Sequence, residues 1–142
     1  MNLRPNLKAN EKRKKQKKLS WYKKRLWEVF AAWIKKRDGG NCFTCPATGC
    51  EGKNYHCGHF VKKSICGIEL YFDERNNHGQ CYNCNINLDG NQYIHGIRIG
   101  AETVSELEEI RRNTKGRVWT RADYEKKIEY YANLLETSEI KQ

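Results

Sequence analysis

Four of the seven cysteines stand in two pairs that have the spacing of metal ligands. Cys42 and Cys45 form one Cys-x-x-Cys pair, and Cys81 and Cys84 form the other. Each pair can place two thiolates on one tetrahedral zinc ion. Residues 46–80 make a longer interval than a zinc finger has, so we interpret them as an inserted functional hairpin. The sequence predicts one structural Zn²⁺ on these four cysteines. We treat Cys50, Cys57 and Cys66 as non-ligands, although Cys50 or Cys57 could substitute as a ligand.

The composition favours metal binding over disulfides. The chain has no apolar run near the ~18 residues that a membrane span needs, and its Lys-rich start has no apolar segment behind it. We therefore expect a soluble cytoplasmic protein without a membrane partner. Cytoplasmic thiols stay reduced, and an odd number of cysteines does not suit a disulfide framework.

The segment between the cysteine pairs resembles a nuclease motif. It holds His56-Cys57-Gly58-His59-Phe60 and then Asn76-Asn77-His78-Gly79-Gln80, and Asn85 directly follows Cys84. This order resembles the zinc-framed form of the HNH, or ββα-metal, nucleases. A closer resemblance is to the NinG/Rap family of lambdoid phages, which are recombination endonucleases acting on branched DNA. This resemblance is most specific from Cys81 to Asn91. It rests on four stretches: Gly58-His59-Phe60, Arg75-Asn76 through Gln80-Cys81, Cys84-Asn85 and Leu88-x-Gly90-Asn91.

The resemblance implies a role for each of three residues. His59 would be the general base, since a neutral imidazole can take a proton from the attacking water. Asn85 would offer a hard amide oxygen to a catalytic Mg²⁺ or Mn²⁺ ion. Asn76 would brace the loop that carries His59 through hydrogen bonds from its side chain to the backbone.

One position departs from the HNH pattern. Many HNH nucleases carry a metal-binding acid immediately before the base, and this chain has Gly58 there. The missing ligand could be His56 or Asp73, and we favour His56 as a catalytic residue and metal ligand. In an ideal strand, positions i and i+3 face opposite ways, so His56 would need a bulge or turn at Gly58.

Two further histidines are less informative. No ligand spacing recurs around His95, which we interpret as a surface or packing residue. His78 could contact a phosphate, support a catalytic residue or simply belong to a turn.

The positive charge is concentrated at the N-terminus. Residues 1–38 hold fourteen Lys and Arg against three acidic residues, whereas the remainder holds thirteen against fourteen. Such a segment suits a polyanion, because each neutralised phosphate releases counterions. We expect a disordered basic arm at 1–19 and a basic amphipathic helix at 20–38, with these residues contacting DNA: Arg13, Lys14, Lys15, Lys17, Lys18, Lys23, Lys24.

The elements that must position these residues indicate an α+β fold. We expect a zinc-stabilised, HNH-like nuclease core at 39–95, with strands at Tyr55–Phe60 and Gly67–Phe72 and a helix just after Cys84. A helical segment at 96–142 should hold two helices, since Thr103/Glu106 and Thr120/Asp123 are both typical of N-terminal caps.

The resemblance implies metal-dependent hydrolysis of DNA phosphodiesters in branched recombination intermediates such as Holliday junctions. A homodimer would suit that activity, because symmetrical resolution of a junction takes two cuts. One alternative is a non-catalytic zinc module that binds nucleic acid, which would not need His59 and Asn85. Another is an adaptor that recruits proteins through its aromatic C-terminal helices.

Overall fold

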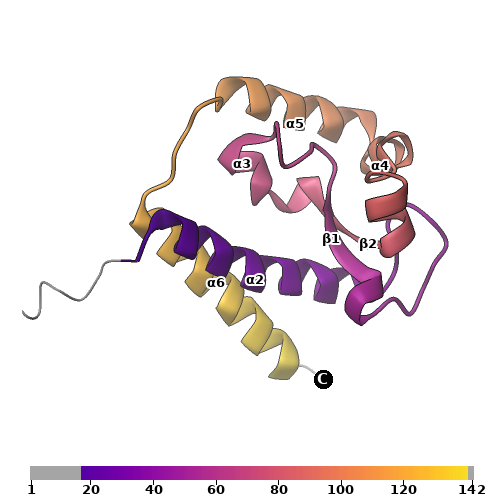
Figure 1. Ribbon diagram of the computed structural model, residues 1–142, viewed down its shortest axis with the longest axis horizontal. Helices are drawn as coiled ribbons and strands as arrows, with labels where there is room; N and C mark the ends of the chain where they lie inside the picture. The colour runs from indigo at the N-terminus through magenta and orange to yellow at the C-terminus, as the bar shows by residue number, and fades with distance from the viewer. Residues whose placement is uncertain (1–16, 141–142) are drawn as a thin grey trace, which may run out of the picture.

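The computed structural model describes residues 17–140 and has a mixed α+β, mostly helical architecture (Figure 1). The expected DNA contacts Arg13, Lys14 and Lys15 lie outside these residues, as does most of the expected arm. Among the described helices, none is long and apolar enough to cross a membrane. Figure 1 shows three levels: helix α5 at the top, α3 and the β-hairpin in the middle, and α2 with α6 at the bottom.

Helix α2 (Leu19–Asp38) forms where the apolar periodicity predicts it. Leu26, Phe30 and Ile34 are fully buried on one face, so packing holds this basic helix in place. The helix ends at Gly39, whose φ of 64° is left-handed and whose N–H donates to the Lys35 carbonyl at 3.0 Å. Glycine adopts this conformation without strain, which explains why the predicted end point is right.

Helix α6 (Arg121–Ile140) packs against α2 through aromatic side chains. The rings of Phe30 and Tyr131 meet edge to face with centroids 5.0 Å apart. The cap predicted at its start is confirmed: the Thr120 N–H donates to Asp123 Oδ2 at 2.8 Å, and the Asp123 N–H donates to Thr120 Oγ1 at 3.2 Å.

The sheet is one antiparallel hairpin of β1 (Tyr55–His59) and β2 (Asn77–Cys81). Its register is regular, with Tyr55 opposite Cys81 and His59 opposite Asn77, so the bulge expected at Gly58 is absent. The first predicted strand is confirmed.

The second predicted strand, at Gly67–Phe72, is wrong. That segment is the short helix α3 (Gly67–Tyr71), which begins at a left-handed Gly67 (φ 72°) and buries Leu70 completely. The true second strand has no large apolar side chain, so its sequence carries no strand periodicity.

Short helices surround the hairpin. The 3₁₀ turns η1 (Gly52–Asn54) and η2 (Glu74–Asn76) precede β1 and β2, and the helix expected after Cys84 is a single π-helical turn, η3 (Asn83–Asn87). A helix that we did not predict, α4 (Gln92–Ile99), crosses the expected boundary between residues 95 and 96.

Helix α5 (Ala101–Asn113) covers α3 and buries Leu107 against Leu70, but the cap predicted at Thr103 is wrong. The helix begins earlier, directly after Gly100, and it has no side-chain cap. Glu106 instead accepts a hydrogen bond from Arg75 at 3.0 Å.

Candidate functional site

The four cysteines of the two Cys-x-x-Cys pairs converge at one end of the hairpin. Their sulfur atoms all lie within 4.8 Å of one another, and the Sγ atoms of Cys45 and Cys81 are 3.7 Å apart. Four thiolates on one tetrahedral zinc ion lie about 3.8 Å apart, so the cluster fits Zn²⁺. Among the described residues, the other three cysteines take no part in such a cluster.

Hydrogen bonds tie this cluster to the hairpin. The Cys84 N–H donates to Cys81 Sγ at 3.5 Å, and the Phe43 N–H in the first cysteine loop donates to the Gly79 carbonyl of β2 at 2.8 Å. Although burial raises the pKa of Cys42, hydrogen bonds from Cys81 and Thr44 lower it to about 6.

Burial raises the pKa of Cys84 and raises that of Cys45 to about 12, and the thiols of Cys42 and Cys81 add to both shifts. One thiolate therefore forms readily, and further deprotonation within the cluster is favoured by a divalent cation.

His59 ends β1 and is held in one orientation. Its Nε2 lies 2.9 Å from the Tyr71 carbonyl oxygen, and a carbonyl can only accept, so Nε2 carries the proton. The ring stacks on Trp27 of α2, with centroids 5.2 Å apart and an interplanar angle of 19°. Its Nδ1 has no hydrogen-bond partner among the described residues and keeps a lone pair.

The same surroundings keep His59 neutral. Burial, with smaller contributions from the nearby Lys63 and Lys23 ammonium groups, lowers its pKa to about 4 and outweighs the hydrogen bond to Tyr71, which raises it. At neutral pH this imidazole is therefore a proton acceptor.

Asn76 fastens the loop behind His59. Its Oδ1 accepts from the Val61 N–H at 2.7 Å, and its Nδ2 donates to the carbonyl oxygens of Val61 at 3.2 Å and Leu70 at 3.0 Å. These are side-chain to backbone contacts of the bracing kind expected for this fully buried residue.

His59 and Asn85 line one surface cavity of about 360 Å³. Lys62 and Lys63 stand on its rim, and Lys63 Nζ lies 4.4 Å from the centroid of the Trp27 ring that stacks on His59. The sequence analysis did not assign these two lysines. Their position within four residues of His59 is the available signal in the sequence, and it is weaker than the charge run at the N-terminus.

His56 lies on the opposite face of the hairpin from His59, and there it contacts Asn85. The Nε2–H of His56 donates to the Lys53 carbonyl at 2.9 Å, so Nδ1 is the unprotonated nitrogen, and it accepts from Asn85 Nδ2 at 2.9 Å. The meeting needs no bulge, because η3 lies on the face of the hairpin that carries His56.

The remaining candidates lie outside this arrangement. The carboxylate of Asp73 accepts hydrogen bonds from the backbone and side chain of Arg75 and caps η2. His78 Nδ1 lies 2.9 Å from Nε2 of the fully buried His95, and its ring stacks on Phe43 at 3.8 Å. His95 is thus a packing residue.

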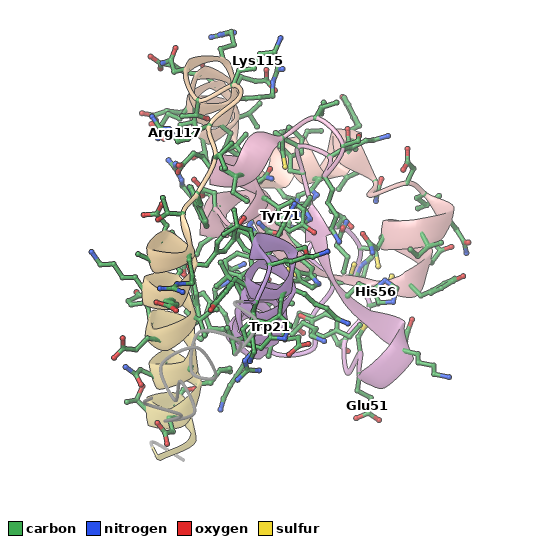
Figure 2. All side chains as sticks on the ribbon, turned by 60° about the vertical axis from the view of Figure 1, so that its left-hand side comes forward. Trp21, Glu51, His56, Tyr71, Lys115 and Arg117 are labelled. Atoms are coloured by element: carbon green, nitrogen blue, oxygen red, sulfur yellow. The ribbon has the colours of Figure 1, made fainter. Side chains whose placement is uncertain are left out.

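Of the expected DNA contacts on and before α2, Lys23 is closest to the cavity. Its Nζ lies 4.2 Å from the Tyr71 ring centroid, beside His59. Lys17 lies over Trp21, and Lys18 and Lys24 are exposed. In Figure 2, Trp21 lies on α2 and His56 lies to its right, on the hairpin.

Comparison with known proteins identifies the family. The family model described as "Bacteriophage Lambda NinG protein" matches residues 4–140. The chain belongs to this family. The protein ninG of Escherichia phage 933W is 29% identical over 126 residues, which cover 80% of this chain and 60% of the phage protein. That of Escherichia phage lambda is 29% identical over 126 residues, covering 80% and 59%.

The NinG protein of Enterobacteria phage H19B is 32% identical over 94 residues, covering 63% of this chain and 45% of its own length. The chain thus spans 60% or less of these curated NinG relatives. No solved structure matches it.

Proposed function

We propose that this NinG family member is a metal-dependent DNA endonuclease of the HNH, ββα-metal type, with His59 as its general base. The observation that carries this proposal is the setting of His59, which lines a cavity together with Lys62 and Lys63. Its Nε2 donates to the Tyr71 carbonyl, so the buried Nδ1 keeps a lone pair that has no hydrogen-bond partner among the described residues.

His59 would perform the first step of hydrolysis. His59 Nδ1 takes a proton from water, the water oxygen bonds to phosphorus, and the bond from phosphorus to the 3′ oxygen breaks. Solvent protonates the leaving oxygen, which gives 5′-phosphate and 3′-hydroxyl ends. Lys63 would bind a phosphate near the scissile bond, and Lys62 would do so by exchanging its ion pair with Asp89 for a phosphate.

The cavity also fits a hard divalent cation. Asn85 offers its amide Oδ1, the kind of ligand that Mg²⁺ and Mn²⁺ prefer, and His56 fixes that amide by accepting from its Nδ2. When bound, the cation would stabilise the negative charge that develops on the phosphate and leaving oxygens. Ligation by His56 itself stays a prediction, and it would require His56 to give up its bond to Asn85.

The substrate follows from the family resemblance. We propose that the protein cuts branched recombination intermediates such as Holliday junctions, as a homodimer in the cytoplasm of the phage host. Assaying the purified protein with Mg²⁺ on labelled linear, forked and four-way DNA tests this. Faster cleavage of the branched substrates is expected, and binding to all three without cleavage would favour the non-catalytic binding module.

The pH dependence should reveal the buried base. With the pKa of His59 at about 4, the deprotonated form persists well below neutrality and is lost only as the pH falls toward 4. We expect kcat/KM to change little between pH 8 and pH 6, because this ratio reports ionisation of the free enzyme. A histidine of ordinary pKa would lose activity near pH 6.5, so a midpoint there would contradict the assignment of His59.

Lys63→Gln should weaken DNA binding in a salt-dependent way. Removing one phosphate contact lowers the slope of log K against log salt by about 0.9. Lys115→Gln is the matched control, since Lys115 is exposed beyond the end of α5 and stands well away from His56 in Figure 2. Titrating labelled DNA at several salt concentrations checks this, and equal slopes for the two variants would remove Lys63 from the DNA interface.

A further inference from the structure

Gln80 of β2 has a buried oxygen without a partner. The side chain is fully buried, and its Nε2 donates at 2.9 Å to both Thr44 Oγ1 and the Gly90 carbonyl. Because a carbonyl can only accept, the contact with Gly90 fixes which end of the amide is nitrogen. The opposite end, Oε1, has no hydrogen-bond partner among the described residues. A buried carbonyl oxygen in this state calls for a donor or a cation.

Asn85 turns its own oxygen toward the same place. His56 Nδ1 takes up the Asn85 amide nitrogen, which leaves Oδ1 pointing toward Gly58 of β1. A Cβ atom built on Gly58 would lie 1.8 Å from Gln80 Oε1 and 3.0 Å from Asn85 Oδ1. Two amide oxygens, each with its orientation fixed by another contact, therefore converge over this glycine.

Gly58 itself explains why the acid of the HNH pattern is missing. Any side chain there would overlap the Gln80 amide, so the two positions are coupled across the hairpin. Gln80 lies opposite His56 in the register, on the face of the hairpin that meets Asn85. The Gln80 oxygen therefore occupies the space that an acid at position 58 would take.

The geometry points to Gln80 Oε1 and Asn85 Oδ1 as paired ligands of a hard divalent cation, with His56 as the positioning residue that aims Asn85. This inference rests on the proposed function, and it names the ligand that the HNH pattern leaves missing in this chain. Neutral amide oxygens are ligands for Mg²⁺ and Mn²⁺. Because they carry no charge, the affinity of this site for the cation should be modest.

Mn²⁺ binding to the zinc-loaded full chain, measured by titration calorimetry without DNA, tests the ligand pair. Gln80→Met keeps the side-chain volume and removes the oxygen, so the dissociation constant should rise at least about tenfold, the lower end of what even outer-sphere partners cost. Asn85→Ala should weaken binding similarly, whereas Asn87→Ala, at an exposed amide on the same turn, should not. Zinc content and the melting temperature report whether each variant is folded.

A paired substitution separates ligation from packing. Gln80→Ala should weaken Mn²⁺ binding, and adding Gly58→Asp should restore it, because the space left by the amide then admits a carboxylate. An aspartate cannot replace the hydrogen bonds that Gln80 donates to Thr44 and Gly90, so a purely structural role would not be rescued.

The outcomes are distinguishable. If Asn85→Ala weakens Mn²⁺ binding while folded Gln80→Met does not, or if Gly58→Asp fails to rescue a folded Gln80→Ala protein, Gln80 is not a ligand and the proposed function stands. If Asn85→Ala has no effect either, the metal site of the proposed function is itself wrong.

Discussion

Cys84→Ser should release zinc and abolish the cooperative unfolding of the hairpin region. A serine hydroxyl does not ionise near neutral pH, so it cannot replace a thiolate ligand. The buried cluster around this site consists of cysteines and Tyr55, with too little apolar surface to fold alone. Structural zinc supplies on the order of 10 kcal/mol in small peptides, which is comparable to the whole stability of a typical domain.

Cys66→Ser is the matched control. Cys66 and Cys84 are both 1% exposed, but Cys66 packs against Leu70 and lies outside the four-sulfur cluster. We expect this variant to keep one zinc ion per chain with a modest loss of stability. Metal analysis and thermal melting followed by circular dichroism measure both effects. A wild-type protein that is folded and free of zinc would refute the metal centre.

The helices were the more predictable part of the fold. Helix α2 has apolar residues on one face and a glycine at its end, and α6 has Thr120 and Asp123 at its start, so local chemistry specifies both. Strand β2 escaped prediction because its burial comes from the cysteine cluster and from side-chain amides, which produce no alternating apolar pattern. The helix of Gly67–Tyr71 escaped because its apolar residues are equally typical of a strand.

The candidate site, too, could be predicted from the sequence only in part. The spacing of the cysteines predicted a cluster that the structure brings together, because each Cys-x-x-Cys pair is a local unit. The sequence predicts Asn85 and His56 as ligands of one metal ion, but not the hydrogen bond between them, since that bond depends on which face of the hairpin η3 covers. Gln80 could not be identified from sequence, because its role depends on a glycine in the opposite strand.

His59→Ala should lower the rate of DNA cleavage by about 10²- to 10⁴-fold, the usual contribution of a general base. That loss corresponds to roughly 3–5 kcal/mol of transition-state stabilisation. DNA affinity should stay near that of the wild type, because the lysines on the cavity rim and on α2 remain. Single-turnover cleavage of a four-way junction measures the chemical step, and fluorescence anisotropy of the same labelled DNA measures binding.

Two controls distinguish chemistry from packing, because the His59 ring also contacts Trp27 and Tyr71. His59→Gln fills more of the site than alanine and still lacks a base of suitable pKa, so it should be as inactive as His59→Ala while melting closer to the wild type. His78→Gln alters another hairpin histidine, whose Nδ1 is taken up by His95, and it should cleave at nearly the wild-type rate.

Excess Mn²⁺ should not restore either His59 variant, because what is missing is a proton acceptor and not a metal ligand. A folded His59→Ala protein that cleaves junctions at the wild-type rate would leave the cavity without its base and make the zinc-containing DNA-binding module the better interpretation.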